Sequence, residues 1–359
     1  MTSNIPNRLQ KIRRELVEKK IDGIFISQAE NRYYLSNFLG TAGYLLITGR
    51  DAVLATDFRY TAQAGIQSPE YRIFQITGNS LDWFVQLVAE LKIKRLGFES
   101  GNITFAFHRK LYEAMNKAEA KLELIPVEAT VESIRELKEP EEIELITKAA
   151  DIADKAMEHI REIIHVGITE REVAWEIEKF MREKGSQSLP FEAIVASGPN
   201  AALPHHRPSG RRIGPCEPVV IDIGAKVGGY CSDLTRTIFI DKQDDAQFNQ
   251  VYNTVLKAQL AAISMIHEGT NGVEADSAAR VVITNAGFGQ AFGHSLGHGV
   301  GLNGHEQPRL GPNSTDTLVS GMVFTIEPGI YLTGWGGVRI EDLVVLENGK
   351  IKVLSKAKK

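Results

Sequence analysis

The sequence lacks several features that mark secreted, membrane or nucleic-acid-binding proteins. Its 359 residues include only two cysteines, Cys216 and Cys231, too few for a disulfide framework, so we expect a reducing compartment, the cytoplasm. No run of 18 apolar residues occurs, so no membrane span is predicted. Residues 1–20 are charged and carry no apolar core, so a signal peptide is not expected there.

An excess of basic residues is also missing. Lysine and arginine total 41 against 45 aspartates and glutamates, for a net charge of −4. Proteins that bind nucleic acids or anionic membranes draw affinity from clustered Lys and Arg, so we expect neither partner. Hydrophobic residues make up 43% of the chain, which at this length is enough for the cores of two domains.

Hydrophobic periodicity divides the chain into two regions. In residues 1–128, short β-rich segments alternate with helical ones, which is typical of a small α/β domain. In residues 129–359, long helical patterns accompany runs of strands, which indicates an α+β domain. The predicted helices cover residues 5–20, 81–92, 140–164, 169–185, 246–267 and 273–286, and the predicted strands cover residues 23–27, 44–49, 52–57, 95–100, 218–224, 230–240, 321–332 and 337–346.

The most informative pattern is a set of acidic residues inside apolar strand segments. The four are Asp222, Asp233, Glu327 and Glu341. An ionised carboxylate in a buried strand is unfavourable unless it is paired, hydrogen-bonded or bound to a metal. An edge strand or a salt bridge to arginine explains any single case about as well. Four such residues in one domain favour a shared cation site.

The segment between Asp222 and Asp233 bears on this hypothesis. Residues 224–229, GAKVGG, are typical of a hairpin turn. A two-residue loop would place both aspartates on one face of the ribbon, whereas a three-residue loop would place them on opposite faces. Glu327 and Glu341 lie on successive strands joined by a glycine-rich loop, and they could converge in the same way.

A glycine-rich segment contains three of the nine histidines: residues 292–306, FGHSLGHGVGLNGHE. So many glycines disfavour a helix and let the backbone approach an ion closely. A lone histidine is more often a partly buried structural residue, but these accompany four acids. One imidazole with four carboxylates forms an oxygen-rich set whose charge balances two divalent cations. Without thiolates, such a set suits Mn²⁺, Co²⁺ or Zn²⁺.

Taken together, these segments resemble the pita-bread metallopeptidases, which include the Xaa-Pro aminopeptidases, the prolidases (Xaa-Pro dipeptidases) and the methionine aminopeptidases. The matching stretches, besides Asp222, are SDLTRT at 232–237, GHSLGHGVGLNGHE at 293–306, TIEPGIY at 325–331, VRIEDL at 338–343 and ASGPNAALPHHRPSG at 196–210. A further block, residues 30–60, resembles the N-terminal domain of creatinases and Xaa-Pro peptidases, which plain methionine aminopeptidases lack. The resemblance implies an α+β chain, with a creatinase-like α/β domain over residues 1–128 and a pita-bread catalytic domain over residues 129–359.

The resemblance also implies a ligand set for two divalent ions, most simply Mn²⁺, with Co²⁺ or Zn²⁺ as alternatives. The ligands would be Asp222, Asp233, His298, Glu327 and Glu341. Asp233 and Glu341 would bridge the ions, and Glu327 would act as general base and then as general acid. Creatinases share the fold but lack these ligands.

Five further residues would surround the substrate. They are His205, His294, His305, Tyr331 and Arg339. By resemblance, His305 would bind the side of the scissile carbonyl, while His205 and His294 would orient the substrate and stabilise the tetrahedral intermediate. Tyr331 and Arg339 would support the carboxylate ligands. The neighbouring His206 receives no role and is interpreted as an exposed loop residue.

The resemblance implies hydrolysis of an Xaa-Pro bond in proline-containing peptides by a homodimer. Aminopeptidase activity on longer peptides is the leading prediction, and a dipeptidase restricted to Xaa-Pro is the alternative. Methionine aminopeptidase activity is less favoured because it needs no N-terminal domain. A peptide-binding module without catalysis is the non-enzymatic alternative, and the intact ligand set argues against it.

Overall fold

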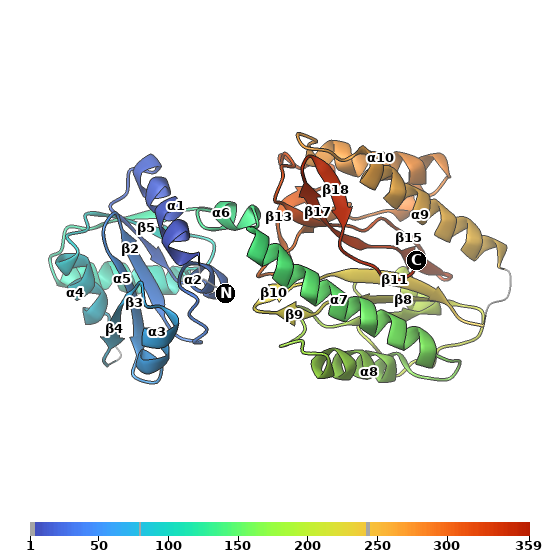
Figure 1. Cartoon of the computed structure of the whole chain (residues 1–359), viewed down its shortest axis with the longest axis horizontal. Coiled ribbons are helices and arrows are strands. Elements are labelled where there is room, and N and C mark those ends of the chain that lie inside the picture. The colour runs from blue at the N-terminus through green and yellow to red at the C-terminus, as the bar shows by residue number, and fades with distance from the viewer. Residues whose placement is uncertain (1–3, 79, 242–244) are drawn as a thin grey trace. The chain divides into compact units, whose positions relative to one another are not determined.

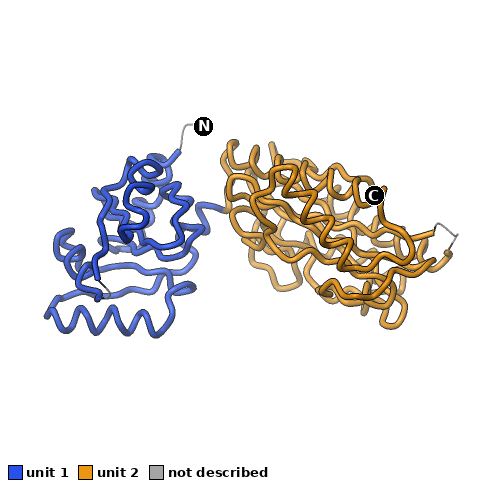
Figure 2. Tube along the Cα trace, turned by 90° about the horizontal axis from the view of Figure 1, so that it is seen from below, with its two compact units in different colours: residues 1–135 blue, residues 136–359 orange. Residues whose placement is uncertain are grey.

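The structure, a computed structural model, describes residues 4–78, 80–241 and 245–359. The chain forms two compact units, Met1–Arg135 and Glu136–Lys359 (Figure 2). The boundary expected from the sequence, between residues 128 and 129, lies in the loop that follows strand β6 (Glu123–Val127). Within the described ranges, none of the helices combines the length and the apolar character that a bilayer crossing requires.

The first unit is a mixed six-stranded sheet with helices packed against it (Figure 1). The strand order is β4-β3-β2-β1-β5-β6. Its elements are α1 (Ile5–Glu18), β1 (Gly23–Ile26), α2 (Ala29–Ser36), β2 (Tyr44–Thr48), β3 (Ala52–Asp57), α3 (Thr61–Gln67), β4 (Arg72–Ile76), α4 (Asp82–Glu90), β5 (Arg95–Glu99), α5 (Phe105–Lys117) and β6, followed at the unit boundary by α6 (Glu132–Glu136). Phe25 of β1 packs edge-on against Phe84 of α4, with ring centroids 5.5 Å apart. The apolar spacing that predicted the first helix is confirmed, because Leu9, Ile12 and Leu16 are buried.

The second unit consists of two halves, each of which packs two helices against a sheet. In the first half, α7 and α8 pack on the sheet β11-β8-β7; in the second, α9 and α10 pack on the sheet β13-β12-β14-β17-β18. The elements are α7 (Pro140–Ile163), α8 (Glu170–Glu183), β7 (Ile194–Ser197), the 3-10 helix η1 (Gly198–Ala202), β8 (Pro218–Ile223), β9 (Lys226–Val227), β10 (Tyr230–Cys231), β11 (Leu234–Phe239), α9 (Ala246–Met265), α10 (Gly272–Asn285), the 3-10 helix η2 (Gly289–Ala291), β12 (Gly297–Gly299), β13 (Glu306–Leu310), β14 (Val323–Ile326), β15 (Gly329–Leu332), β16 (Gly336–Arg339), β17 (Asp342–Glu347) and β18 (Lys350–Val353).

An interrupted antiparallel ribbon lies in the first half. β8 pairs with β11 and β9 pairs with β10 in one continuous register, closed by the turn at Gly228 and Gly229. Both glycines have positive φ, as a tight two-residue hairpin turn requires. Of the two loop lengths that the sequence left open, the structure has the two-residue turn, and its register places Asp222 and Asp233 on the same face. Gly224 lies opposite Asp233, and a Cβ there would fall 2.4 Å from the Ser232 carbonyl oxygen.

The second half contains a matching interrupted ribbon. β14 pairs with β17 and β15 pairs with β16, again in one register, which places Glu327 opposite Glu341 at the interruption. At this point the backbone amides of both glutamates donate to residues outside the ribbon. Glu327 N donates to the Leu296 carbonyl at 2.8 Å, and Glu341 N donates to the Thr235 carbonyl at 3.1 Å. Both glutamates therefore stand at a break in the strand ladder.

Candidate active site

A cavity of about 760 Å³ in the second unit collects nine of the ten residues that the sequence singled out. Its lining includes Asp222, Asp233, His298, Glu327, Glu341, His205, His294, His305 and Arg339. Tyr331, the tenth, contacts two of them from behind. The volume is in the range of sites that bind small molecules or short peptide segments.

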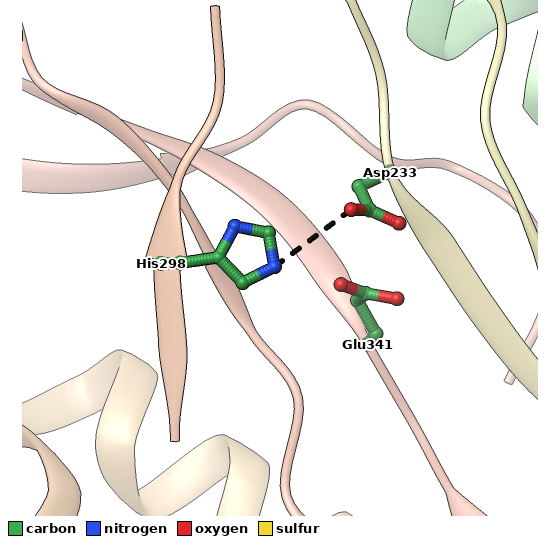
Figure 3. Close-up of side chains that lie close together, drawn as sticks. All are labelled: Asp233, His298 and Glu341. Carbon is green, nitrogen blue, oxygen red and sulfur yellow. Dashed lines mark ion pairs between the residues drawn. The ribbon is translucent and has the colours of Figure 1, made fainter. Parts of the chain in front are cut away.

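Three ligand-type side chains from distant parts of the chain meet in this cavity (Figure 3). Asp233 precedes β11, His298 lies in β12, and Glu341 precedes β17. One nitrogen or oxygen atom from each lies within 4.8 Å of the other two, and the imidazole of His298 is directed at the two carboxylates. Two carboxylate oxygens and an imidazole nitrogen are donors that divalent transition metals accept.

The other two predicted ligands adjoin this group. Glu327 Oε1 lies 3.3 Å from His298 Nε2. Asp222 Oδ2 accepts a hydrogen bond from Arg339 Nη2 at 2.8 Å. Asp222 Oδ1 is buried and has no hydrogen-bond partner in the described part of the chain. A buried carboxylate oxygen with unused lone pairs is unfavourable unless a cation binds it, so this atom fits a metal site.

Crowding of acids shifts the pKa values at the centre of the cavity. Asp233 and Glu341 are 4% and 2% exposed. Burial, and then repulsion from neighbouring carboxylates, raises the pKa of each well above its ordinary value. A cation would remove this repulsion, because it would neutralise the charge that burial disfavours. The donor set and its electrostatics therefore fit bound divalent ions.

Glu327 and His298 form an ion pair with opposite shifts. Burial acts to raise the pKa of Glu327, but the hydrogen bond and charge of His298 outweigh it and lower the pKa to about 2. Burial acts to lower the pKa of His298, but Glu327 outweighs it and the net pKa is raised. Among these four carboxylates, Glu327 is the one whose pKa its surroundings lower, whereas burial raises the pKa of the other three.

A chain of hydrogen bonds supports the ligands from behind. Arg339 Nη1 donates to the Tyr331 hydroxyl at 2.9 Å, and this hydroxyl lies 2.9 Å from His294 Nε2. His294 Nδ1 is bonded to the Ser295 carbonyl at 2.8 Å. Burial lowers the pKa of His294, in keeping with a neutral ring. Both of its nitrogens therefore have protein partners, and His294 presents no free donor to a substrate.

Gln259 of α9 holds the two glutamate-bearing segments. Its side-chain nitrogen donates to the Ile326 carbonyl at 3.2 Å and to the Ile340 carbonyl at 3.3 Å. Each of these carbonyls directly precedes Glu327 or Glu341 in the chain. The fully buried Gln259 thus bridges the ribbon where its strand ladder is interrupted.

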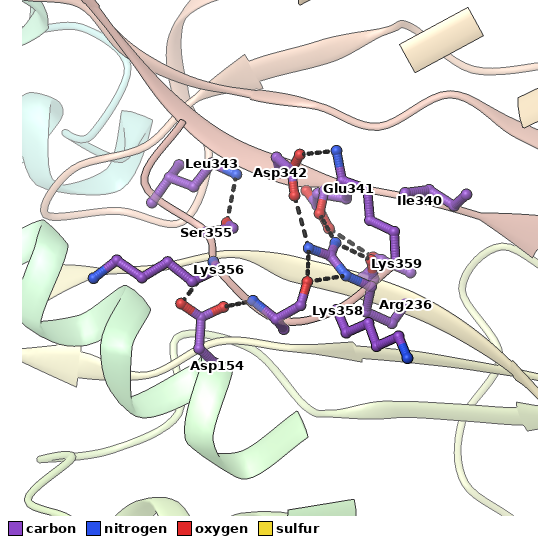
Figure 4. Close-up of polar contacts among 12 residues, drawn as sticks. Asp154, Arg236, Ile340, Glu341, Asp342, Leu343, Ser355, Lys356, Lys358 and Lys359 are labelled. Atoms are coloured by element: carbon purple, nitrogen blue, oxygen red, sulfur yellow. Dashed lines mark hydrogen bonds and ion pairs between the residues drawn. The ribbon is translucent and has the colours of Figure 1, made fainter. Parts of the chain in front are cut away.

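Arg236 of β11 is a second fully buried support (Figure 4). Its guanidinium donates to the carbonyls of Thr235 and Glu341, to Asp342 Oδ1 at 2.8 Å and to the Ala357 carbonyl at 2.8 Å. The Thr235 hydroxyl in turn donates to Glu341 Oε2 at 2.6 Å. These contacts hold both the backbone and the side chain of Glu341.

The remaining histidines lie at the exposed side of the cavity. The ring of His305 stacks on that of His298, with centroids 3.9 Å apart and an interplanar angle of 23°. His205 is exposed and lines the cavity. The interpretation of His206 as an exposed loop residue is wrong: it is half-buried, and its Nε2 lies 2.8 Å from Glu170 Oε2. No local pattern points to this partner, which is 36 residues away in the chain.

Comparison with known proteins assigns the chain to a family. The model of metallopeptidase family M24 matches residues 144–348, and that of the creatinase/prolidase N-terminal domain matches residues 8–137. The chain therefore belongs to metallopeptidase family M24 and is a hydrolase. The predicted fold class, an α+β chain with a pita-bread domain after a creatinase-like one, is confirmed, and the family implies divalent metal ions.

Individual relatives are similar over nearly the whole chain. The structure of an Xaa-Pro dipeptidase from Bacillus anthracis is 42% identical, with a TM-score of 0.95 and 99% of each chain covered. That of an X-Pro aminopeptidase from Thermotoga maritima is 34% identical, with a TM-score of 0.87 over 94% of this chain and 96% of the other. A curated Xaa-Pro dipeptidase from Pyrococcus furiosus is 37% identical over 98% of each chain.

Proposed function

We propose that the protein is a metal-dependent Xaa-Pro peptidase that releases the residue preceding proline from the N-terminus of a peptide. The observation that carries this proposal is the convergence of four carboxylates and His298 in one cavity, where Asp222 Oδ1 has no hydrogen-bond partner among the described residues. Relatives named Xaa-Pro dipeptidase and X-Pro aminopeptidase, similar over nearly the full length, support the choice of substrate.

The proposed ligands of two divalent cations are Asp222, Asp233, His298, Glu327 and Glu341. We expect Mn²⁺, with Co²⁺ or Zn²⁺ as alternatives, and Asp233 and Glu341 would hold the ions together with the other three ligands. When bound, such ions supply Lewis acidity that acidifies water and polarises a carbonyl. The absence of a thiolate from this set favours these ions over a structural zinc site.

The protein's own groups have separate tasks in the proposed reaction. Glu327 lines the cavity beside His298, so its carboxylate would be placed to take a proton from the attacking water and pass it to the leaving nitrogen. His205 and His305 line the exposed part of the cavity and would orient the carbonyl and stabilise its developing charge. His294 contributes through Tyr331 rather than as a free donor, because both of its nitrogens are bonded.

Proline as the leaving group is consistent with this arrangement. A bond to proline has no amide hydrogen, so an enzyme that relies on that donor handles it poorly. The site proposed here engages the carbonyl and the free α-amine and needs no such hydrogen. Restriction to dipeptides is the alternative, and one observation favours it: the exposed cations Arg207 and Arg309 line the cavity and could pair with a free carboxylate.

Hydrolysis of two substrates of different length tests the proposal. We expect the Mn²⁺-loaded enzyme to cleave Xaa-Pro-Xaa-Xaa after its first residue and to lose this activity in a chelator. Cleavage of Xaa-Pro alone would select the dipeptidase. A protein that binds two ions yet cleaves neither substrate would contradict the peptidase proposal. The homodimer and the cytoplasmic location stay predictions from the sequence, and gel filtration of the purified protein tests the first.

A further inference from the structure

Glu170, the first residue of α8, is fully buried outside the cavity and accepts six hydrogen bonds. Oε1 accepts from Ser197 N at 2.8 Å, Ser197 Oγ at 2.8 Å and Asn200 Nδ2 at 2.9 Å. Oε2 accepts from His206 Nε2 at 2.8 Å, Ser209 N at 3.0 Å and Ser209 Oγ at 2.6 Å. All six donors belong to one segment, residues 197–209.

The helix itself does not need this carboxylate. Thr169 and Glu172 already cap the start of α8 with reciprocal hydrogen bonds. The backbone of the helix also joins the same segment, because Arg171 N donates to the Ser209 carbonyl at 3.1 Å. Beyond the short 3-10 helix η1, residues 203–209 form no regular element, so side-chain contacts and isolated backbone hydrogen bonds fix their course.

His205 lies in this segment between two anchored neighbours. The carbonyl of Pro204 accepts from Arg339 Nη1 at 3.4 Å, on the side of the cavity. His206 is held by Glu170, and its backbone amide donates to the Leu203 carbonyl at 3.1 Å. His205 itself is exposed and lines the cavity. Its position therefore depends on contacts made by the residues on either side of it.

We propose that Glu170 is a positioning residue that fixes residues 197–209 so that His205 faces the substrate carbonyl. This inference rests on the proposed function, since it assumes the role given there to His205. Glu170 touches neither the cavity nor the proposed metal ligands, so its effect would pass through the segment. A catalytic donor displaced by about 1 Å loses on the order of a hundredfold in rate, so the anchoring would be visible in kcat.

The first test needs no substrate. Glu170→Gln replaces one acceptor oxygen by an NH₂ group that faces three donors, so half of the anchor is lost. In the full-length, Mn²⁺-loaded protein we expect faster hydrogen exchange confined to residues 197–211, with the bound metal content unchanged. Exchange equal to that of the wild type would overturn the proposal. Glu172→Gln is the matched control, because Glu172 is exposed in the same helical turn and bonds only to Thr169 within the described part of the chain.

The second test is a double-mutant cycle with His205→Ala, measured as kcat and KM for an Xaa-Pro peptide. We expect Glu170→Gln to lower kcat by about tenfold to a hundredfold and to have less than a twofold further effect once His205 is removed. If the double variant shows the product of the two single-variant effects on kcat, the proposal is overturned. An unchanged kcat in His205→Ala would overturn it as well. Glu172→Gln should stay within twofold of the wild type.

Two further outcomes are also decisive. If Glu170→Gln does not fold, Ser209→Ala, which removes a hydroxyl donor to Glu170 and lies outside the cavity lining, enters the same cycle. Multiplication of its effect with that of His205→Ala would refute the anchoring. A folded, metal-loaded wild-type protein that cleaves no Xaa-Pro peptide would refute the proposed function. The exchange measurement would then still decide whether Glu170 holds residues 197–209.

Discussion

Buried carboxylates occur in both units, and two of them, Glu99 in the first and Asp233 in the second, have opposite surroundings. In the first unit, Glu99 is 7% exposed and accepts hydrogen bonds from Ser27 N at 2.6 Å, Ser27 Oγ at 2.9 Å, Gln28 N at 2.7 Å and Asn31 Nδ2 at 2.7 Å. In the second, Asp233 is 4% exposed and accepts no hydrogen bond from the residues that the structure describes. Burial is similar for the two residues, whereas the supply of hydrogen-bond donors and the neighbouring charges differ.

The pKa shifts show what this difference means. Burial is the main cause that raises the pKa of Glu99, and its hydrogen bonds pull the value back down. Burial also raises the pKa of Asp233, and the neighbouring acids Glu341 and Asp222 raise it further. A buried acid with a full set of donors holds the chain together, whereas a buried acid beside other acids needs a cation.

Asp233→Ala should have the largest effect on metal content and kcat. A small effect would contradict the distinction between Asp233 as a metal ligand and Glu99 as a structural acid. We expect the variant to lose bound metal and activity together, by about a thousandfold or more, because a catalytic metal supplies several kcal/mol. Metal analysis and kcat on an Xaa-Pro peptide measure both. In the metal-free form the variant should unfold at a temperature no lower than the wild type, since one repelling acid is gone. Retained turnover with two bound ions would contradict the assignment.

His305→Ala separates substrate contacts from metal ligands. The variant should keep its metal, because His305 contacts the site by stacking on His298, while kcat falls about a hundredfold with the loss of a donor to the carbonyl. His267→Ala is the control, because His267 is exposed and absent from the cavity lining. An unchanged kcat in His305→Ala would remove this histidine from the mechanism.

Glu170 is a second buried acid with many hydrogen-bond donors, and the pH dependence of its contribution to the free energy of unfolding can be measured. Although burial acts to raise the pKa of Glu170, its hydrogen bonds lower it from 4.5 to about 2. The folded state therefore binds this proton less tightly than the unfolded state, and the carboxylate stabilises the fold above pH 5 by about 3 kcal/mol. This contribution is lost as the pH falls towards 2. Urea unfolding of metal-free wild type and Glu170→Gln should show a difference in the free energy of unfolding that is constant from pH 7 to about pH 5 and narrows as the pH falls from 5 towards 2. A difference independent of pH below about 5 would refute the depressed pKa.

Glu99→Gln should have the smallest effect on chemistry. We expect the free energy of unfolding of the first unit to fall by about 1–3 kcal/mol, because a buried acceptor of several hydrogen bonds is weakened. The metal content and kcat should remain within twofold of the wild type. A loss of metal comparable to that of Asp233→Ala would show that donor supply does not distinguish structural acids from ligands.

Local signals explain what the sequence could predict. A helix was expected over residues 169–185, and α8 begins there behind the cap formed by Thr169 and Glu172. The glycine-rich segment 224–229 indicated a hairpin turn, although its loop length, and with it the register of Asp222 and Asp233, stayed open until the structure showed the turn at Gly228 and Gly229. Acids in apolar strands stood out because burial of charge is rare. These features depend on only a few neighbouring residues, so a short stretch of sequence is enough to predict them.

Contacts between distant segments were not predictable in this way. Gln259 looks like any polar residue of a helix, yet it reaches carbonyls 67 and 81 residues away. Glu170 follows a capping threonine and suggests only a favourable charge at a helix N-terminus, although its partners lie up to 39 residues further on. Periodicity gives the buried face of a helix, and only the packed structure shows which backbone lies against that face.

The interruptions in the two antiparallel ribbons affect which substitutions this fold can accept. Asp233, Glu327 and Glu341 lie at the positions where the hydrogen bonding between neighbouring strands is interrupted. The strand hydrogen bonds on either side therefore do not depend on these three residues. Neutral side chains at these points would relieve repulsion and leave the walls of the cavity in place. After a gene duplication, a few substitutions at these positions could therefore convert one copy into a peptide-binding protein that keeps the cavity but has no catalytic activity.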